Sequence, residues 1–195
     1  MADVLEQARA YGFLGPGPVA PHVEHARGFA AAFATPPERF VDLGSGGGVP
    51  GLVLAELWPS SGVVLLDSME RRTAFLAEAV TALGWDDRVE VARARAEEYG
   101  REHRGAFDGV VARGFAPPPV TAECAAPLLR PGGLLVVSEP PEGASRWPAE
   151  AVATLGLATE AVLTGIARYQ VLRQIAVCPE MYPRRVGIPS KRPLW

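Results

Sequence analysis

Residues 41–52 read VDLGSGGGVPGL, and this short stretch decides the fold class of the chain. Four of the five positions from 44 to 48 are glycines, which permit a tight turn and leave the backbone open to a ligand. An apolar run at 39–43 precedes the glycines, and an amphipathic segment near 51–58 follows them. A strand, a glycine-rich turn and a helix in this order are typical of the first unit of an α/β nucleotide-binding fold.

The alternation of strand and helix continues along the chain. Apolar runs typical of strands recur at 63–66, 89–92, 109–112 and 134–138, and the clearest helical pattern lies at 69–83. The last two runs, 158–163 and 169–177, are joined by a connection too short for a helix, so they should pair antiparallel. We therefore predict a doubly wound, Rossmann-like α/β fold with a seven-stranded, mostly parallel sheet and an antiparallel last strand.

The length and charge pattern indicate one domain with two small appendages. A chain of 195 residues, 48% of them apolar, can bury one sizeable core. We expect a short helical N-terminal extension at 1–37, the α/β domain at 38–178 and a basic C-terminal tail at 179–195, packed on the domain or extending from it. The net charge is −3, yet residues 181–195 contain four basic residues and no acid. The tail is therefore the best candidate for contact with an anionic partner.

Composition also predicts where the protein works and what it lacks. No apolar stretch approaches the roughly 18 residues needed to cross a bilayer, so we expect no membrane association. Cys124 and Cys178 have no metal-ligand spacing, and one bridge would add little to a chain of this size, which favours a reducing, cytoplasmic setting. His22 and His25 could hold a metal from one helix face, but we interpret them as surface or capping residues and predict no metal site.

The glycine-rich turn is compatible with two cofactors. Residues 46–51 satisfy the dinucleotide pattern G-x-G-x-x-G, whereas 42–48 satisfy D-x-G-x-G-x-G. We favour the second because a carboxylate at Asp42 would repel a pyrophosphate but attract the ammonium and sulfonium groups of S-adenosylmethionine. Asp67 ends the next strand and would bind a ribose diol with either cofactor. The loop residues predicted to bind cofactor are Asp42, Gly44, Ser45 and Gly46.

Five strings, in this order, carry a resemblance to a known family. They are VDLGSGGGVPGLVLA at 41–55, LLDSMERRTAFL at 65–76, RAEE at 95–98, FDGVVARGFA at 107–116 and MYPRRVGIPSKRPLW at 181–195. From about residue 40 to the C-terminus the chain resembles the RsmG (GidB) family, enzymes that methylate guanine N7 in 16S rRNA with S-adenosylmethionine. The tail is the most family-specific string, since the glycine loop alone indicates only the broad methyltransferase class.

The resemblance implies a set of site residues. Arg113 would be the catalytic residue, organising both cofactor and substrate. Guanine N7 has a lone pair and no proton, so transfer requires an in-line approach rather than a general base. The residues that the resemblance places around the cofactor are Gly44, Val49, Ala96, Glu97 and Arg113, with Asp67 and Ser68 at the ribose side.

The expected partner is small-subunit rRNA or the 30S particle. Deletion of residues 184–195 should weaken RNA binding while sparing the cofactor. Two departures from the family pattern keep other functions open: Glu139 stands where the family usually carries a lysine, and the usual Asn-Leu-Thr segment is absent. The alternatives are a related methyltransferase with another RNA or a small-molecule substrate, and a non-catalytic nucleotide- or RNA-binding module. The residues predicted to contact RNA phosphates are Arg168, Arg184, Arg185, Lys191 and Arg192.

Overall fold

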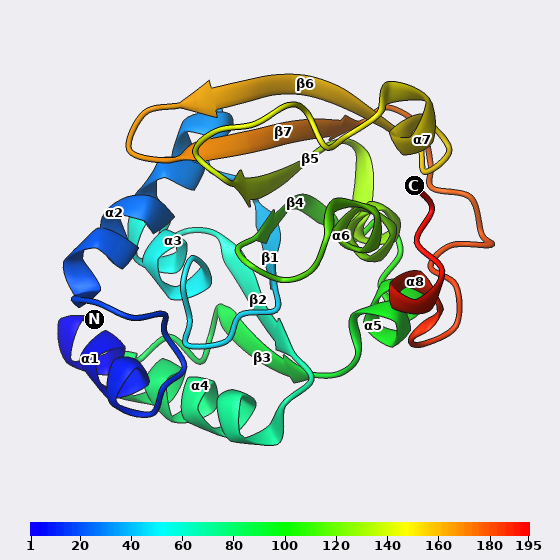
Figure 1. Cartoon of the computed structure of the whole chain (residues 1–195). Helices are drawn as coiled ribbons and strands as arrows, with labels where there is room; N and C mark the ends of the chain where they lie inside the picture. The colour runs from blue at the N-terminus through cyan, green and yellow to red at the C-terminus, as the bar shows by residue number, and fades with distance from the viewer.

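A seven-stranded sheet forms the centre of the molecule in the computed structural model, which describes all 195 residues (Figure 1). The strand order is β3-β2-β1-β4-β5-β7-β6. The first five strands are parallel, and β7 runs antiparallel to both of its neighbours, which confirms the predicted doubly wound fold. The strands are β1 (Arg39–Leu43), β2 (Gly62–Asp67), β3 (Val89–Arg93), β4 (Phe107–Ala112), β5 (Leu129–Glu139), β6 (Leu157–Thr164) and β7 (Arg168–Gln174).

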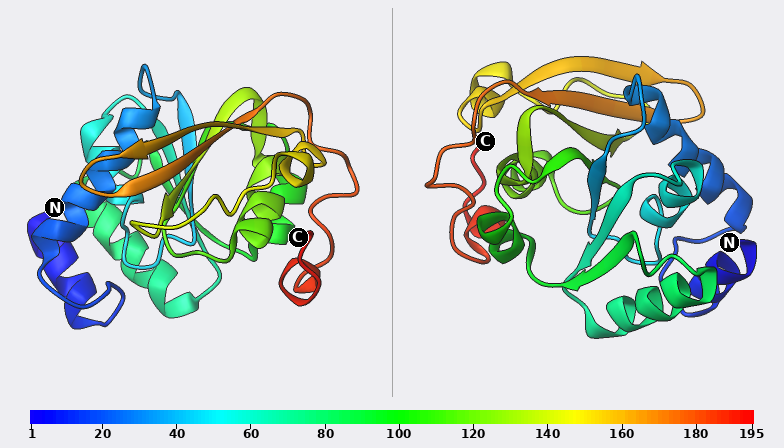
Figure 2. Two further views of the ribbon diagram at one scale, coloured as in Figure 1. Left: turned by 45° about the horizontal axis from the view of Figure 1, so that its top comes forward. Right: turned by 180° about the vertical axis from the view of Figure 1, so that it is seen from behind.

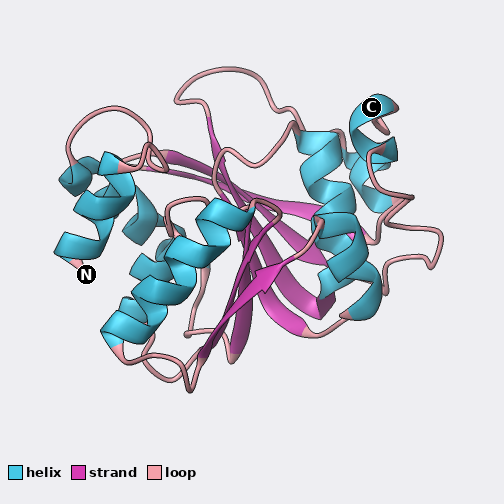
Figure 3. Ribbon diagram, turned by 90° about the horizontal axis from the view of Figure 1, so that it is seen from below, coloured by secondary structure: helices cyan, strands magenta, loops and turns pink.

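Helices cover both faces of the sheet, as Figure 3 shows from below. One face carries the N-terminal helices together with α3 and α4, and the other carries α5 to α8 (Figure 2). The helical segments are α1 (Ala2–Ala10), α2 (Val19–Gly28), η1 (Phe29–Ala32), α3 (Gly51–Leu57), α4 (Glu70–Leu83), α5 (Ala96–Glu102), α6 (Pro118–Ala125), η2 (Ala126–Leu128), α7 (Ala149–Ala153) and α8 (Ile188–Lys191).

The strands build two hydrophobic cores because their side chains alternate between the faces. In β1, for example, Phe40 packs with α3 and α4, whereas Val41 packs with α5 and α6. The predicted final strand ran too far, because the sheet ends at Gln174 and not at residue 177. The buried amide of Gln174 donates hydrogen bonds to the carbonyls of Leu155 and Ala176, which turns the following residues out of the sheet.

The two chain ends pack on opposite faces of the sheet and both reach its carboxyl edge. Leu5 of α1 and Ala26 of α2 are buried against Val49 and Val53, directly behind the glycine loop. Residues 179–195 lie beside α5 and α6 (Figures 1 and 2). None of the helices is both long enough and apolar enough to cross a bilayer.

Candidate functional site

The glycine loop is held by hydrogen bonds from its own backbone to the neighbouring strand. The amides of Gly44 and Ser45 both donate to the carbonyl oxygen of Leu66, at 2.8 and 3.0 Å. Gly44 has a φ of +77°, and a Cβ added there would lie 2.6 Å from a ring carbon of Phe115. The loop therefore presents bare backbone, because neither the turn nor the space admits a side chain at residue 44.

Asp42 lies beneath this loop. Its carboxylate is fully buried, and one oxygen accepts a 2.8 Å hydrogen bond from the amide of Gly51, the first residue of α3. The other oxygen, Oδ1, has no hydrogen-bond partner. Burial raises the pKa of Asp42 to about 7, although the hydrogen bond from the Gly51 amide and the charge of Arg113 act in the opposite direction. Asp42 lines none of the cavities described below, so it can act on a ligand mainly through its charge.

The main cavity, of about 260 Å³, opens at the carboxyl ends of β1 and β2 beside the start of α5. Asp67 lies in its wall and is already fixed there. Its Oδ2 accepts the Gly46 amide at 3.0 Å, and its Oδ1 accepts the Met69 amide at 2.9 Å. The predicted cofactor residues that line this cavity are Gly44, Asp67, Ser68, Ala96 and Glu97.

The C-terminal tail forms part of the wall of the main cavity. No motif in the sequence predicts this role for the tail. Ser190 lines the cavity, and the buried carboxylate of Glu97 accepts the Gly187 amide at 2.9 Å. Cys124 also lines the cavity, and burial raises the pKa of its thiol, so the sulfur stays protonated. No sequence motif indicates these contacts, since they join residues that lie far apart along the chain.

The loop cavity, of about 180 Å³, lies on the other side of the glycine loop. Its second wall is residues 13–15 of the N-terminal extension, which no motif had marked as part of the site. Gly114 lines this cavity as well as the main one, so the two share a border. The predicted cofactor residues found here are Gly44, Ser45, Gly46, Val49 and Arg113.

Arg113 is held in the loop cavity by a histidine. Its Nη2 donates to His22 Nδ1 at 2.5 Å. Because a guanidinium can only donate, the imidazole proton must lie on Nε2, which is 3.2 Å from the Gly15 carbonyl and donates to it. Burial lowers the pKa of Arg113, and it lowers that of His25 to about 4, with further contributions from Arg113 and His22. His22 is half-buried, and its contact with Arg113 was not predicted from the sequence.

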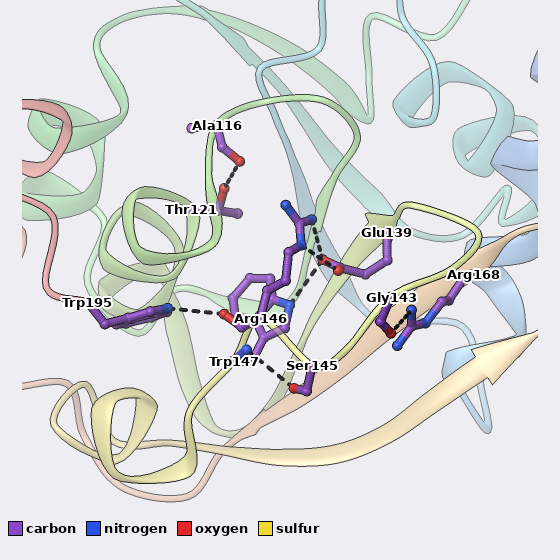
Figure 4. Close-up of polar contacts among 9 residues, drawn as sticks. All are labelled: Ala116, Thr121, Glu139, Gly143, Ser145, Arg146, Trp147, Arg168 and Trp195. Carbon is purple, nitrogen blue, oxygen red and sulfur yellow. Dashed lines mark hydrogen bonds and ion pairs between the residues drawn. The ribbon is translucent and has the colours of Figure 1, made fainter.

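A third cavity, the β5 cavity, of about 310 Å³, lies at the ends of β4 and β5 and shares residues 114–116 with the main cavity. Figure 4 shows the polar contacts of Glu139, Arg146 and Trp147, which line it. Glu139 stands where the family usually carries a lysine, which by itself would leave an anion in place of a cation. Instead, both of its oxygens accept hydrogen bonds from Arg146, each at 2.9 Å, and one also accepts Trp147 Nε1 at 3.0 Å. The carboxylate thus brings a neutralising cation to the cavity.

The predicted RNA-contacting residues fall into two groups. Arg184 is committed to the fold, because its guanidinium donates to both oxygens of Glu123, a fully buried carboxylate, at 2.8 and 2.6 Å. Arg168 donates to the Gly143 carbonyl at 2.8 Å. The remaining three, Arg185, Lys191 and Arg192, are exposed, and their side chains make no hydrogen bond or ion pair within the chain. No cluster of three His, Cys, Asp or Glu residues could hold a metal ion.

Comparison with solved structures indicates the methyltransferase fold. A putative O-methyltransferase from Klebsiella pneumoniae aligns with a TM-score of 0.64 and 18% identity, over 89% of each chain. The putative methyltransferase yhhF from Escherichia coli aligns with a TM-score of 0.58 and 16% identity, over 79% of this chain and 86% of that one. At these identities the likeness concerns the fold alone.

Sequence comparison is more specific. The family described as "GidB: rRNA small subunit methyltransferase G" matches residues 27–141. The ribosomal RNA small subunit methyltransferase G of Moorella thermoacetica is 37% identical over 177 residues, covering 85% of this chain and 73% of the relative. The protein of the same name from Thermotoga neapolitana is 41% identical over 162 residues, covering 79% and 70%. The chain therefore belongs to the GidB family, that of rRNA small subunit methyltransferase G.

Proposed function

We propose that this protein transfers the methyl group of S-adenosylmethionine to N7 of a guanine in 16S rRNA. One observation carries the proposal: the main cavity and the loop cavity adjoin at the bare backbone of Gly44 and Gly114. An elongated ligand with a nucleoside at one end and an amino acid at the other fits this division. Family membership then favours a methyl donor over a dinucleotide.

The residues around the two cavities suit S-adenosylmethionine, which supplies a methyl group on a positively charged sulfur. Asp67 is fixed by two backbone amides and paired with Arg72 at 3.4 Å, and it would offer the remaining lone pair of Oδ1 to a ribose diol, with Ser68 beside it. Ala96 and Glu97 would contact the base, and residues 44–49 the amino acid end. The unpartnered Oδ1 of Asp42 puts uncompensated negative potential below the loop, which favours a cationic ligand.

Arg113 would organise the reaction from the loop cavity. Its hydrogen bond to His22 fixes the guanidinium, and an arginine keeps its positive charge even when half-buried. We assign it to the carboxylate of the cofactor, which would orient the donor for an in-line approach by N7. Arg113→Ala should lower the affinity for S-adenosylhomocysteine or the turnover by at least about tenfold. Unchanged affinity and turnover in this variant would show that Arg113 does not take part in the site.

The remaining parts of the chain would bring RNA to this edge of the sheet. We propose residues 38–178 as the methyltransferase domain, 1–37 as its N-terminal extension and 179–195 as a docked tail. The substrate would be 16S rRNA, free or in the 30S particle, in the cytoplasm. The four side chains that we assign to RNA phosphates are Arg168, Arg185, Lys191 and Arg192, whereas Arg184 holds the tail to the domain.

Transfer of labelled methyl groups tests the function. Purified protein and S-adenosylmethionine labelled in the methyl group would be incubated with intact 30S subunits, protein-free 16S rRNA or a mixture of small metabolites. We expect label in RNA, at a single guanine. Mild reduction should make the glycosidic bond of this guanine labile, and aniline should then cleave the RNA chain at that position. Label only in a small metabolite would indicate a methyltransferase with another substrate. Binding of cofactor or RNA without any transfer would leave the non-catalytic module.

A further inference from the structure

We propose that the β5 cavity holds the target nucleotide, that Arg146 binds a phosphate of this nucleotide, and that Glu139 is a positioning residue for Arg146. The inference rests on the proposed function and names the substrate side of the same site. The cavity borders the main cavity through Gly114, Phe115 and Ala116, so an acceptor placed in it would adjoin the methyl donor. Its volume of about 310 Å³ falls at the low end of the range for ligand pockets.

Glu139 and Arg146 form an ion pair but differ strongly in exposure, and this difference points to a ligand for Arg146. The Glu139 side chain is only 4% exposed, whereas that of Arg146 is 45% exposed. Three of the four acceptor sites of Glu139 are occupied, by the Nε and Nη2 groups of Arg146 and by Trp147 Nε1. Arg146 lines the cavity and uses two of its five N–H donors, which leaves three without a protein partner. The pair therefore offers a ligand three N–H donors against one remaining acceptor site.

Hydrogen bonds along residues 143–147 hold the backbone around Arg146 (Figure 4). Its backbone carbonyl accepts a 3.1 Å hydrogen bond from the indole N–H of Trp195. The amide of Trp147 donates to Ser145 Oγ at 3.3 Å, and Arg168 holds the Gly143 carbonyl at 2.8 Å. These contacts fix the backbone of the segment, and the two hydrogen bonds to Glu139 orient the guanidinium before a ligand arrives, which lowers the entropy cost of binding.

Chemistry selects a phosphate as the group that Arg146 binds. A guanine offers an arginine its O6 and N7 atoms, but an arginine on N7 would occupy the lone pair that must attack the methyl group. The ring also becomes positively charged on methylation, so a cation at N7 would oppose the reaction. A phosphate offers acceptors in a geometry that matches the free edge of the guanidinium and leaves N7 available.

The test compares Arg146→Ala with Arg130→Ala. Arg130 is also an exposed arginine paired with a carboxylate, Asp108, but it lies at the opposite end of β5. We expect Arg146→Ala to raise the KM for 16S rRNA by about tenfold or more and to leave the affinity for S-adenosylhomocysteine unchanged. The slope of the logarithm of RNA affinity against the logarithm of salt concentration should fall by an amount that corresponds to about one phosphate contact. Arg130→Ala should change none of these. Glu139→Gln should shift KM and salt slope in the same direction as Arg146→Ala, by a smaller factor.

Two features keep the test decisive. Arg146→Ala leaves a buried carboxylate unpaired, so the double variant Glu139→Gln/Arg146→Ala, which removes both charges, repeats the measurement in a protein without that penalty. The salt slope is measured as binding of a 16S rRNA transcript in the presence of S-adenosylhomocysteine and needs no turnover. Equal slopes for the wild-type protein and both Arg146 variants, or an equal loss in Arg130→Ala, would overturn the inference. An inactive wild-type protein that still shows the slope difference would overturn only the proposed function.

Discussion

The glycine loop and the C-terminal tail both line the main cavity, but different kinds of contact hold them there. The loop is fixed by hydrogen bonds between neighbours in the sheet, such as those from Gly44 and Ser45 to Leu66. The tail is fixed by two buried carboxylates on other helices, Glu97 of α5 and Glu123 of α6. A site built from backbone can be read from local sequence, whereas a site completed by distant side chains cannot.

The largest expected effect tests how the tail is held. Arg184→Ala removes the only cation paired with Glu123, which is fully buried. Loss of one partner of a buried pair costs about 3–5 kcal/mol, and we expect about 3 kcal/mol because Arg184 itself is 24% exposed. The midpoint of thermal unfolding should fall by roughly 10 °C.

The neighbouring residue supplies the matched control for this change. Arg185 is exposed and makes no side-chain hydrogen bond, so Arg185→Ala should leave the midpoint almost unchanged. Equal midpoints for the two variants would mean that the ion pair of Arg184 and Glu123 does not hold the tail, and the contrast with the loop would lose its main support.

The second effect tests the loop. In Gly44→Ala the new methyl group would meet the Phe115 ring and would also force a side chain into a left-handed backbone conformation. We expect the affinity for S-adenosylhomocysteine to fall roughly thirtyfold, or about 2 kcal/mol, measured by calorimetry. Gly84→Ala is the control, because Gly84 has a similar φ of +68° with nothing within 4 Å. It should lose about 1 kcal/mol of stability and no affinity.

This comparison explains which parts of the fold and site could be predicted. The strands and helices followed from local periodicity, and β1 begins and ends where its apolar run does. Residues at strand ends, such as Asp67, were found because parallel strands bring their carboxyl ends to one edge. The contact between His22 and Arg113, and the pairing of Glu139 with Arg146, could not be found, because each depends on tertiary packing that leaves no periodic signal.

The third prediction concerns Asp42 and pH. Burial raises the pKa of this carboxyl to about 7, so the free protein holds a proton there at pH 6 and releases it by pH 8. S-adenosylmethionine carries a sulfonium and an ammonium group and therefore favours the carboxylate, so its affinity should rise roughly tenfold from pH 6 to pH 8. His25, with a pKa of about 4, stays neutral throughout this window.

Asp42→Asn supplies the control for the pH effect. The variant can still accept the Gly51 amide but cannot titrate, so its affinity should be flat over the same range. Stability of the free protein should respond in the opposite sense. A raised pKa stabilises the fold below the unfolded value of 3.8, and that contribution is lost as the pH rises through about 7. A pH profile of affinity identical in the wild-type protein and in Asp42→Asn would remove Asp42 from cofactor binding.

The smallest effect decides whether the tail belongs to the cofactor site at all. The sequence predicts that loss of the tail spares cofactor binding, whereas Ser190 lines the main cavity and Gly187 donates to Glu97. Truncation after Val186 keeps the pair of Arg184 and Glu123 but removes both of these contacts. Since one hydrogen bond contributes about 1 kcal/mol, the affinity for S-adenosylhomocysteine should fall by about fivefold.

A charge variant separates this effect from RNA binding. Lys191→Ala/Arg192→Ala keeps the backbone of the tail and removes two exposed cations, so it should leave cofactor affinity unchanged while reducing the salt slope of RNA binding. If truncation leaves the affinity unchanged, the tail is only an RNA-binding arm and contributes nothing to cofactor binding. If truncation lowers the affinity and the charge variant does not, the tail is a wall of the cofactor site, in the same sense as the glycine loop.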